Sequence, residues 1–236
     1  MTGLVSIAAA AQDDPWDALL KKYVTAESRV NYAAWKAKDS ATLDAYAGGL
    51  ARMSGPVGKA ESINAYNAFT IQWILRNYPI RSIWDTKKPF NESRHTLAGK
   101  KVSLDDIEKR LRAMGDPRIH AAIVCASRSC PPLRREAYTA ASLDLQLDDN
   151  ARAWLSREDL NQFFPERHSA ELSMIFKWYR KDFGAVPQFL SRFGPPGSYT
   201  KIDYKPYHWG LNDIGDLGKD YTNGEFLRAK IRSVFQ

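Results

Sequence analysis

The fold and the chemistry of this chain centre on residues 116–134, which read DPRIHAAIVCASRSCPPLR. The stretch holds both cysteines of the chain, Cys125 and Cys130, together with His120, one of four histidines. Residues 119–126 form an apolar run of strand length, and the Ser, Arg and Pro residues that follow are typical of a loop. The pattern predicts a buried strand that runs out into a tight loop carrying Cys130.

Cys130 is the residue best suited to nucleophilic chemistry. Pro131 and Pro132 follow it, and because proline fits the first turn of a helix, we expect Cys130 at a helix start. The positive end of a helix and the nearby Arg128 and Arg134 would both stabilise a thiolate and so lower the pKa of the thiol. We therefore predict a reactive thiolate at Cys130.

Two histidines are candidates for the base that serves this thiol. On a strand, His120 would lie on the face opposite to its apolar neighbours, where it could accept a proton. His208 could instead be the base, in the order Cys, His, Asn, with Asn212 as the third residue. His120 is preferred, and the choice between the two stays open.

The cysteines also have simpler interpretations. Cys125 lies inside the apolar run and is expected to be a core residue. A tight loop of five residues could bring Cys125 and Cys130 together as a disulfide, which would remove the nucleophile. A metal site is not expected, because His95, His168 and His208 do not supply two further zinc ligands at matched spacing. No cofactor is predicted.

A predicted helix over 62–78, ended by Pro79, carries the next candidates. Asn64 and Asn67 lie three residues apart and therefore share one side of this helix. A buried asparagine amide can orient an imidazole or donate to an oxyanion, so Asn67 is a candidate catalytic residue. Asn64 and the nearby Tyr66 are candidate substrate contacts. Alternatively, both asparagines only bond to nearby backbone.

Several motifs together resemble the DUF547 family. In chain order they are INAYNAFTI (63–71), LDDI (104–107), DPRIH (116–120), CASRSCPPL (125–133), IFKWY (175–179) and WGLN (209–212). The resemblance covers about residues 15–213. It implies a fold like that of papain-like cysteine peptidases and a link to glutathione or similar thiol peptides. Family members tend to have an aspartate just before the tryptophan of the last motif, so His208 is a departure.

The order of helix-like and strand-like segments predicts an α+β fold. We expect a hairpin that turns at Gly99, extended pieces at 30–35 and 163–172, and a capping box from Ser103 to Asp106. Helices are expected over 15–24, 41–53, 62–78, 104–113, 141–155, 173–183, 187–193 and 226–235. Because no regular βαβ alternation occurs, we predict helices packed beside a small, mainly antiparallel sheet.

Composition predicts one ordinary globular domain. The chain has 236 residues, of which 44% are hydrophobic and 26% are charged. Its formal net charge is +7, but Lys and Arg are scattered among acids and form no run of five or more. Such a basic surface can attract an anionic ligand, and nucleic-acid binding is not predicted.

The first residues resemble the end of a secretory signal. Residues 4–11 form a small apolar block that ends in four alanines. We interpret residues 1–12 as a remnant of such a signal and residues 13–236 as a single domain, which predicts a periplasmic or secreted protein. Alternatively, the segment is a flexible N-terminus of a cytoplasmic protein. No later run approaches the ~20 apolar residues of a membrane span.

Two functions from different classes fit these features. In the first, the Cys130 thiolate attacks a peptide or thioester carbonyl, His120 carries the proton, and an asparagine amide holds the oxyanion. The protein would then be a thiol-dependent hydrolase or transferase for a small peptide or thiol peptide such as glutathione. In the second, the same loop binds a small acidic thiol peptide without turnover.

Arg128 and Arg134 bear on the ligand in both cases. If the loop curls as its prolines predict, both guanidinium groups can face one pocket, and arginine makes paired bonds to a carboxylate. The alternative is that both arginines pair with local acids such as Asp116 or Glu136.

Overall fold

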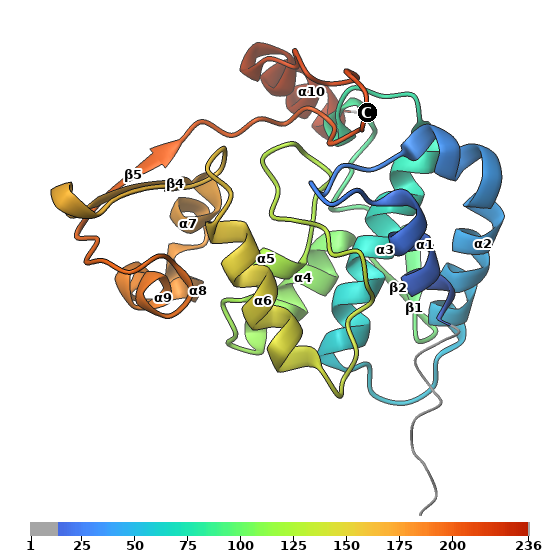
Figure 1. The fold of residues 1–236 in the computed structure, drawn as a ribbon. Coiled ribbons are helices and arrows are strands. Elements are labelled where there is room, and N and C mark those ends of the chain that lie inside the picture. Colours follow the sequence, from blue (N-terminus) through green and yellow to red (C-terminus); the bar gives the residue numbers. More distant parts are fainter. Residues whose placement is uncertain (1–13, 236) are drawn as a thin grey trace, which may run out of the picture.

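The computed structural model describes residues 14–235, so the predicted signal remnant at 1–12 lies outside the described residues. The helices, drawn in Figure 1, are α1 (Pro15–Tyr23), α2 (Tyr32–Arg52), α3 (Lys59–Asn77), η1 (Ile83–Asp85), α4 (Leu104–Ala113), α5 (Ile119–Ala122), α6 (Leu143–Leu155), η2 (Pro165–Arg167), α7 (Met174–Trp178), α8 (Arg180–Phe183), α9 (Val186–Phe193) and α10 (Asn223–Phe235). The strands are β1 (His95–Leu97), β2 (Lys100–Val102), β3 (Gln162–Phe164), β4 (Ser169–Ser173) and β5 (Lys201–Lys205). No helix within residues 14–235 combines the length and apolar character needed to cross a membrane.

The strands of the described chain form two small sheets. The first is the predicted hairpin, in which β1 pairs antiparallel with β2 and the turn at Gly99 has a positive φ of 74°. In the second sheet β3 is antiparallel to β4, whereas β5 returns from later in the chain to lie parallel to β4. The α+β prediction is confirmed. The papain-like part of it stays a prediction.

Helix α3 is the central helix among those around the site. Fourteen of its nineteen residues are buried, on all sides of the helix, and the helix ends before Pro79 as predicted. The predicted capping box at the start of α4 is also confirmed. Its Ser103 N–H donates to Oδ2 of Asp106 over 2.9 Å, and the Asp106 N–H donates to Oγ of Ser103 over 3.1 Å.

The predicted strand over 119–126 is wrong, because Ile119–Ala122 form the short helix α5. The N–H of Arg118 donates to Oδ1 of Asp116 over 3.1 Å, and Pro117 supplies a φ suited to a first helical turn. Backbone bonds from His120 to Pro117 and from Ile119 to Asp116 continue this turn. The Asp-Pro pair before the apolar run is therefore a helix-start signal that outweighs the β-branched residues after it.

Three further local predictions differ from the structure. No helix begins directly after Cys130, because residues 131–134 are irregular, so Cys130 does not lie at the start of a helix. Residues 30–35 are not extended throughout, since α2 begins at Tyr32. The helix expected over 173–183 is divided into α7 and α8.

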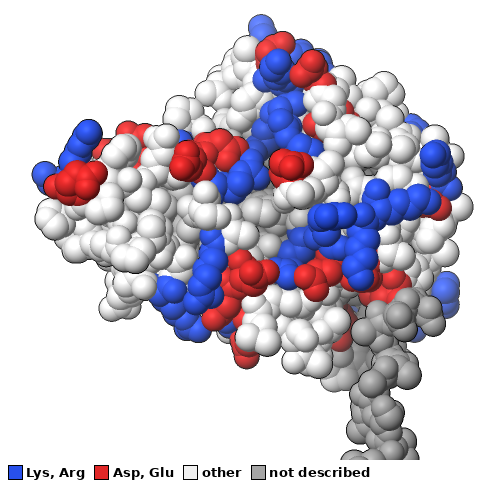
Figure 2. Space-filling model, viewed as in Figure 1, with Lys and Arg blue, Asp and Glu red and all other residues white. Residues whose placement is uncertain are grey.

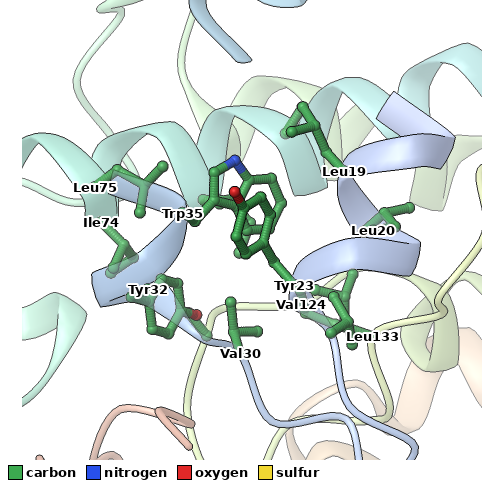
Figure 3. Close-up of a cluster of buried hydrophobic side chains, with 14 of the residues drawn as sticks. Leu19, Leu20, Tyr23, Val30, Tyr32, Trp35, Ile74, Leu75, Val124 and Leu133 are labelled. Atoms are coloured by element: carbon green, nitrogen blue, oxygen red, sulfur yellow. The ribbon is translucent and has the colours of Figure 1, made fainter. Parts of the chain in front are cut away.

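Residues 119–130 contribute to all three hydrophobic clusters of the described chain. Ile119 packs in a cluster beneath α3 and α4, and Ala121 packs in a second one with α6 to α9. Val124 belongs to a third with α1 and α2, and Figure 3 shows it next to Leu133, on the same side of that cluster as Leu20. The segment that carries the cysteines is therefore held from three directions.

Candidate active site

A cavity of about 170 Å³ opens beside the two cysteines. Its walls come from α3, α4, α5, the cysteine segment, α7 and the chain after β5. They include His120, Cys125, Cys130 and seven aromatic residues: Tyr66, Trp84, Phe90, Trp178, Tyr179, Tyr207 and Trp209. Trp209 stacks on Trp178 at 5.6 Å between ring centroids, so the aromatic wall is continuous on that side. We call this space the aromatic cavity.

Four hydrogen-bond donors surround the sulfur of Cys130. The Cys125 N–H donates to it over 3.0 Å, and the Ser127 hydroxyl donates over 3.3 Å. The Tyr207 hydroxyl lies 3.4 Å away, and the Cys125 sulfur lies 2.6 Å away. Cys130 itself is only 6% exposed. Such an environment suits a thiolate better than a neutral thiol, because every group around the sulfur can donate.

The pKa values of the two thiols are driven in opposite directions. Burial raises the pKa of Cys130, but hydrogen bonds from Cys125, Ser127 and Tyr207 outweigh burial and lower it from 9.0 to about 6. The pKa of Cys125 is raised, chiefly because its thiol donates to the Cys130 sulfur and because it is buried. The low pKa predicted for Cys130 therefore has support, but its cause is a set of short-range donors and not a helix start.

Cys125 differs from a plain core residue. It is half-buried and lines the aromatic cavity beside Cys130. Both cysteines are free thiols in this structure, with their sulfurs in direct contact. Cys125 therefore acts as a donor to the candidate nucleophile.

His120 is held by a carboxylate. Its Nε2 lies 2.8 Å from Oδ2 of Asp182, and its ring stacks on Tyr179 with 4.2 Å between centroids. Burial lowers the pKa of His120 to about 4, although the bond to Asp182 opposes this shift. The imidazole is therefore neutral at pH 7. With Nε2–H donating to Asp182, Nδ1 is the nitrogen left to accept a proton.

His208 lies on the other side of the cysteine loop. Its Nδ1 accepts from the Gly210 N–H over 3.1 Å, and its Nε2 lies 2.8 Å from the carbonyl oxygen of Lys219, to which it donates. Both ring nitrogens are thus occupied by backbone groups. His120 is the better placed base, since it lines the aromatic cavity and its Nδ1 has no hydrogen-bond partner within residues 14–235.

Asn64 and Asn67 both use their amides on backbone. Nδ2 of Asn67 donates to the Ala122 carbonyl and Oδ1 accepts from the Val124 N–H, each over 2.9 Å. Asn64 makes the same kind of pair with the carbonyl and N–H of Tyr138. These contacts match the alternative in which the asparagines bond nearby backbone. Asn67 thereby fixes the chain between the base and the thiols.

The remaining predicted contacts are divided between two regions. Tyr66 lines the aromatic cavity, whereas Arg128 and Asn212 line a second cavity behind Cys130. Arg134 faces neither, because it pairs with Glu136 and, over 2.6 Å, with Asp149. The pairing with local acids therefore describes Arg134, and the structure does not bring Arg128 and Arg134 into one pocket.

Three functional candidates were missed in the sequence: Ser127, Asp182 and Tyr207. Ser127 lies within the cysteine segment, where its position between two thiols was the available signal. Asp182 and Tyr207 are 62 and 77 residues from their partners, so no local pattern could identify them. Within residues 14–235 no three His, Cys, Asp or Glu side chains gather in a way that could hold a metal ion.

Comparison with known proteins gives one match. The family model DUF547, described as a protein of unknown function, matches residues 50–155. The matched part contains α3, His120 and both cysteines, while Asp182 and Tyr207 lie beyond it. No curated protein and no solved structure shows a significant similarity. The resemblance to the DUF547 family that the motifs predict is therefore confirmed over residues 50–155.

Proposed function

We propose that the chain is a thiol-dependent hydrolase or transferase that acts on a small peptide or thiol peptide, with Cys130 as nucleophile and His120 as base. The observation that carries this proposal is that both residues line one cavity, each with the partners its role needs. Cys130 has thiolate-stabilising donors, and His120 has the Asp182 carboxylate. A nucleophile, a base and a group that orients the base are the elements of thiol catalysis.

The protonation states of Cys130 and His120 restrict which leaving group the site can expel. At pH 7 the Cys130 sulfur is mostly a thiolate while His120 is neutral, so His120 carries no proton for a leaving group. An amine leaves only when protonated, whereas a thiolate with a pKa of ~8.5 leaves as it is. The proposed first step is attack of the Cys130 sulfur on a thioester carbonyl carbon, which expels the thiol peptide as a thiolate.

The second step uses the base. Nδ1 of His120 takes a proton from water or from another acceptor as that group attacks the acyl carbon. The carbon–sulfur bond to Cys130 then breaks and regenerates the thiolate. Asp182, bonded to Nε2, stabilises the imidazolium that forms in this step.

The walls of the aromatic cavity indicate what part of a substrate fits there. Their aromatic faces suit an apolar group or a cation. Asp105 and Glu108 also line the cavity, and burial raises the pKa of both carboxyl groups. The acyl portion that reaches Cys130 should therefore be apolar or carry an amino group.

A trapping experiment tests this function. The protein is incubated with a panel of acyl-glutathione and short acyl-peptide thioesters while free thiol release is followed, and the acyl adduct is located by mass spectrometry. We expect an adduct on Cys130, none in Cys130→Ser, and retained turnover in the matched Cys125→Ser variant, whose hydroxyl still donates. Binding of the thioesters that survives in Cys130→Ser, without turnover in the wild type, would instead establish the non-catalytic binding protein.

A further inference from the structure

A second cavity, of about 280 Å³, lies on the other side of the cysteine loop. Cys130 and Pro131 belong to the walls of both cavities, so the loop is the partition between them. Unlike the aromatic cavity, this one has polar walls. They include Arg29, Arg128, Arg157, Ser129 and Asn212. We call it the arginine cavity.

Of the three arginines in this cavity, one has a carboxylate partner within the described chain and two do not. Arg157 is matched by Asp159, which accepts two bonds of 2.7 and 2.6 Å from it. Arg29 and Arg128 instead bond only to backbone carbonyls, of Asp213 over 3.4 Å and of Gly215 over 3.1 Å, and within residues 14–235 neither forms an ion pair.

Arg128 is the residue of this cavity that points most directly to an anionic ligand. Its Nε is buried and has no hydrogen-bond partner in the described chain. An unpaired buried donor is unfavourable, and more so on a charged group. Burial and then the charge of Arg29 lower the pKa of Arg128, and the nearby carboxylates of Asp213, Asp216 and Asp220 oppose this shift without cancelling it. An anion between the two guanidinium groups would relieve the remaining repulsion. Arginine also offers paired donors that match the oxygens of a carboxylate or a phosphate.

We propose that the arginine cavity binds a small oxyanion, a carboxylate or a phosphate, between Arg29 and Arg128. The volume is sufficient, because one water molecule takes ~30 Å³ of liquid. Glu27 and Asp159 line the same cavity, but Asp159 is neutralised by Arg157 and Glu27 is exposed. Figure 2 shows that Lys and Arg lie in bands with acids among them, so the site depends on these two side chains and not on a general basic surface. It requires no turnover at Cys130.

The test is titration calorimetry at low ionic strength and pH 7, with inorganic phosphate in one arm and succinate in the other. We expect at least one of them to bind the wild type and to bind about tenfold or more weakly to Arg29→Gln and to Arg128→Gln. Arg134→Gln, which removes an arginine outside the cavity, should bind like the wild type. Binding in only one arm identifies the oxyanion as a phosphate or a carboxylate.

Lysine variants and melting curves separate a loss of binding geometry from a loss of folding. Arg29→Lys and Arg128→Lys retain the charge but lose the forked geometry, so their binding should lie between that of the wild type and that of the Gln variants. Melting curves establish that the variants are folded, and Arg29→Gln decides the matter if Arg128→Gln is not. Absence of heat with both ligands, or unchanged binding in Arg29→Gln, overturns the proposal. Since Cys130→Ser should still bind, loss of the catalytic proposal would leave this one standing.

Discussion

The Nε2 atom of His120 lies 2.8 Å from Oδ2 of Asp182, so the ring is held in one orientation in the wall of the aromatic cavity that both thiols also line. In Asp182→Asn an amide replaces the carboxylate and can no longer stabilise a charged imidazolium. We expect turnover of a thioester substrate to fall by about 100-fold or more. The pH dependence of Cys130 alkylation should stay unchanged, because His120 is not among the groups that set the Cys130 pKa.

Asp182 also forms an ion pair with Arg112, which Asp182→Asn removes. A matched control is Asp148→Asn, which removes ion pairs with Arg118 and Arg152. Its turnover should remain close to that of the wild type. Equal losses in the two variants would show that Asp182 acts through general stability and not through the base.

The hydroxyl of Tyr207 should help to lower the pKa of Cys130. In Tyr207→Phe the Cys130 sulfur loses a donor 3.4 Å away, so its pKa should rise from about 6 by roughly one unit, or ~1.4 kcal/mol. The measurement is the rate of iodoacetamide alkylation against pH, with the modified cysteine located by mass spectrometry. In the wild type, labelling at pH 7 should favour Cys130 over Cys125. Tyr199 is also buried, and its hydroxyl donates to the carbonyl of Pro196, so Tyr199→Phe should leave the pH dependence of Cys130 alkylation unchanged. A shift in Tyr199→Phe as large as that in Tyr207→Phe would contradict the role given to Tyr207.

Much of the local structure could be predicted because its causes are local. Helix α3 shows its apolar pattern and its stop at Pro79, and the Ser103–Asp106 box contains all its partners within four residues. The strand expected over 119–126 is wrong because it rests on the β propensity of Ile and Val. Asp116 and Pro117 instead set a helical backbone conformation at the start of this segment. The bond from the Arg118 N–H to Asp116 and the fixed φ of Pro117 outweigh a weak β preference.

Only part of the candidate site could be predicted from the sequence. Cys130 and His120 attract attention through residue type and proximity in the chain. Asp182 and Arg29 lie far away in sequence. Asp182 reaches His120 only after α8 has packed, and Arg29 reaches the cavity behind Cys130 only after the chain that follows α1 has packed. Charged residues such as these gain a defined role only through contacts that are distant in sequence, and no periodic pattern in the sequence reveals such contacts.

Oxidation should couple the two thiols. Their sulfurs are 2.6 Å apart and both are free, so a mild oxidant such as diamide should take two electrons from the pair and form a Cys125–Cys130 disulfide. Titration with a thiol reagent should then find no free thiol under denaturing conditions, and dithiothreitol should restore both. Cys125→Ser should keep its single thiol after the same treatment. Intermolecular dimers in place of the internal bond would argue against this contact.

Two buried histidines should make the fold sensitive to mild acid. Burial lowers the pKa of His120 to about 4 and that of His95 to about 3, so both are neutral when folded, whereas in the unfolded chain they take up protons below pH ~6.5. The unfolded state then binds more protons, and stability falls as the pH falls from 6.5 towards 4. Each histidine should cost about 2 kcal/mol between pH 7 and pH 5.

Urea unfolding at the two pH values measures this loss. His95→Phe, which preserves a ring stacked on Phe69, should reduce the pH dependence by the share of one histidine. A pH dependence as steep as that of the wild type would mean that other groups cause the acid sensitivity.

One donor to the Cys130 sulfur comes from the main chain, the N–H of Cys125. Side-chain substitution at residue 125 leaves that N–H in place, proline excepted. Exchanges at Ser127 or Tyr207 would therefore change the acidity of the thiol in steps, while this main-chain donor stays in place. Sequence drift can thus alter the reactivity of Cys130 gradually, while the path of the backbone preserves a minimum level of it.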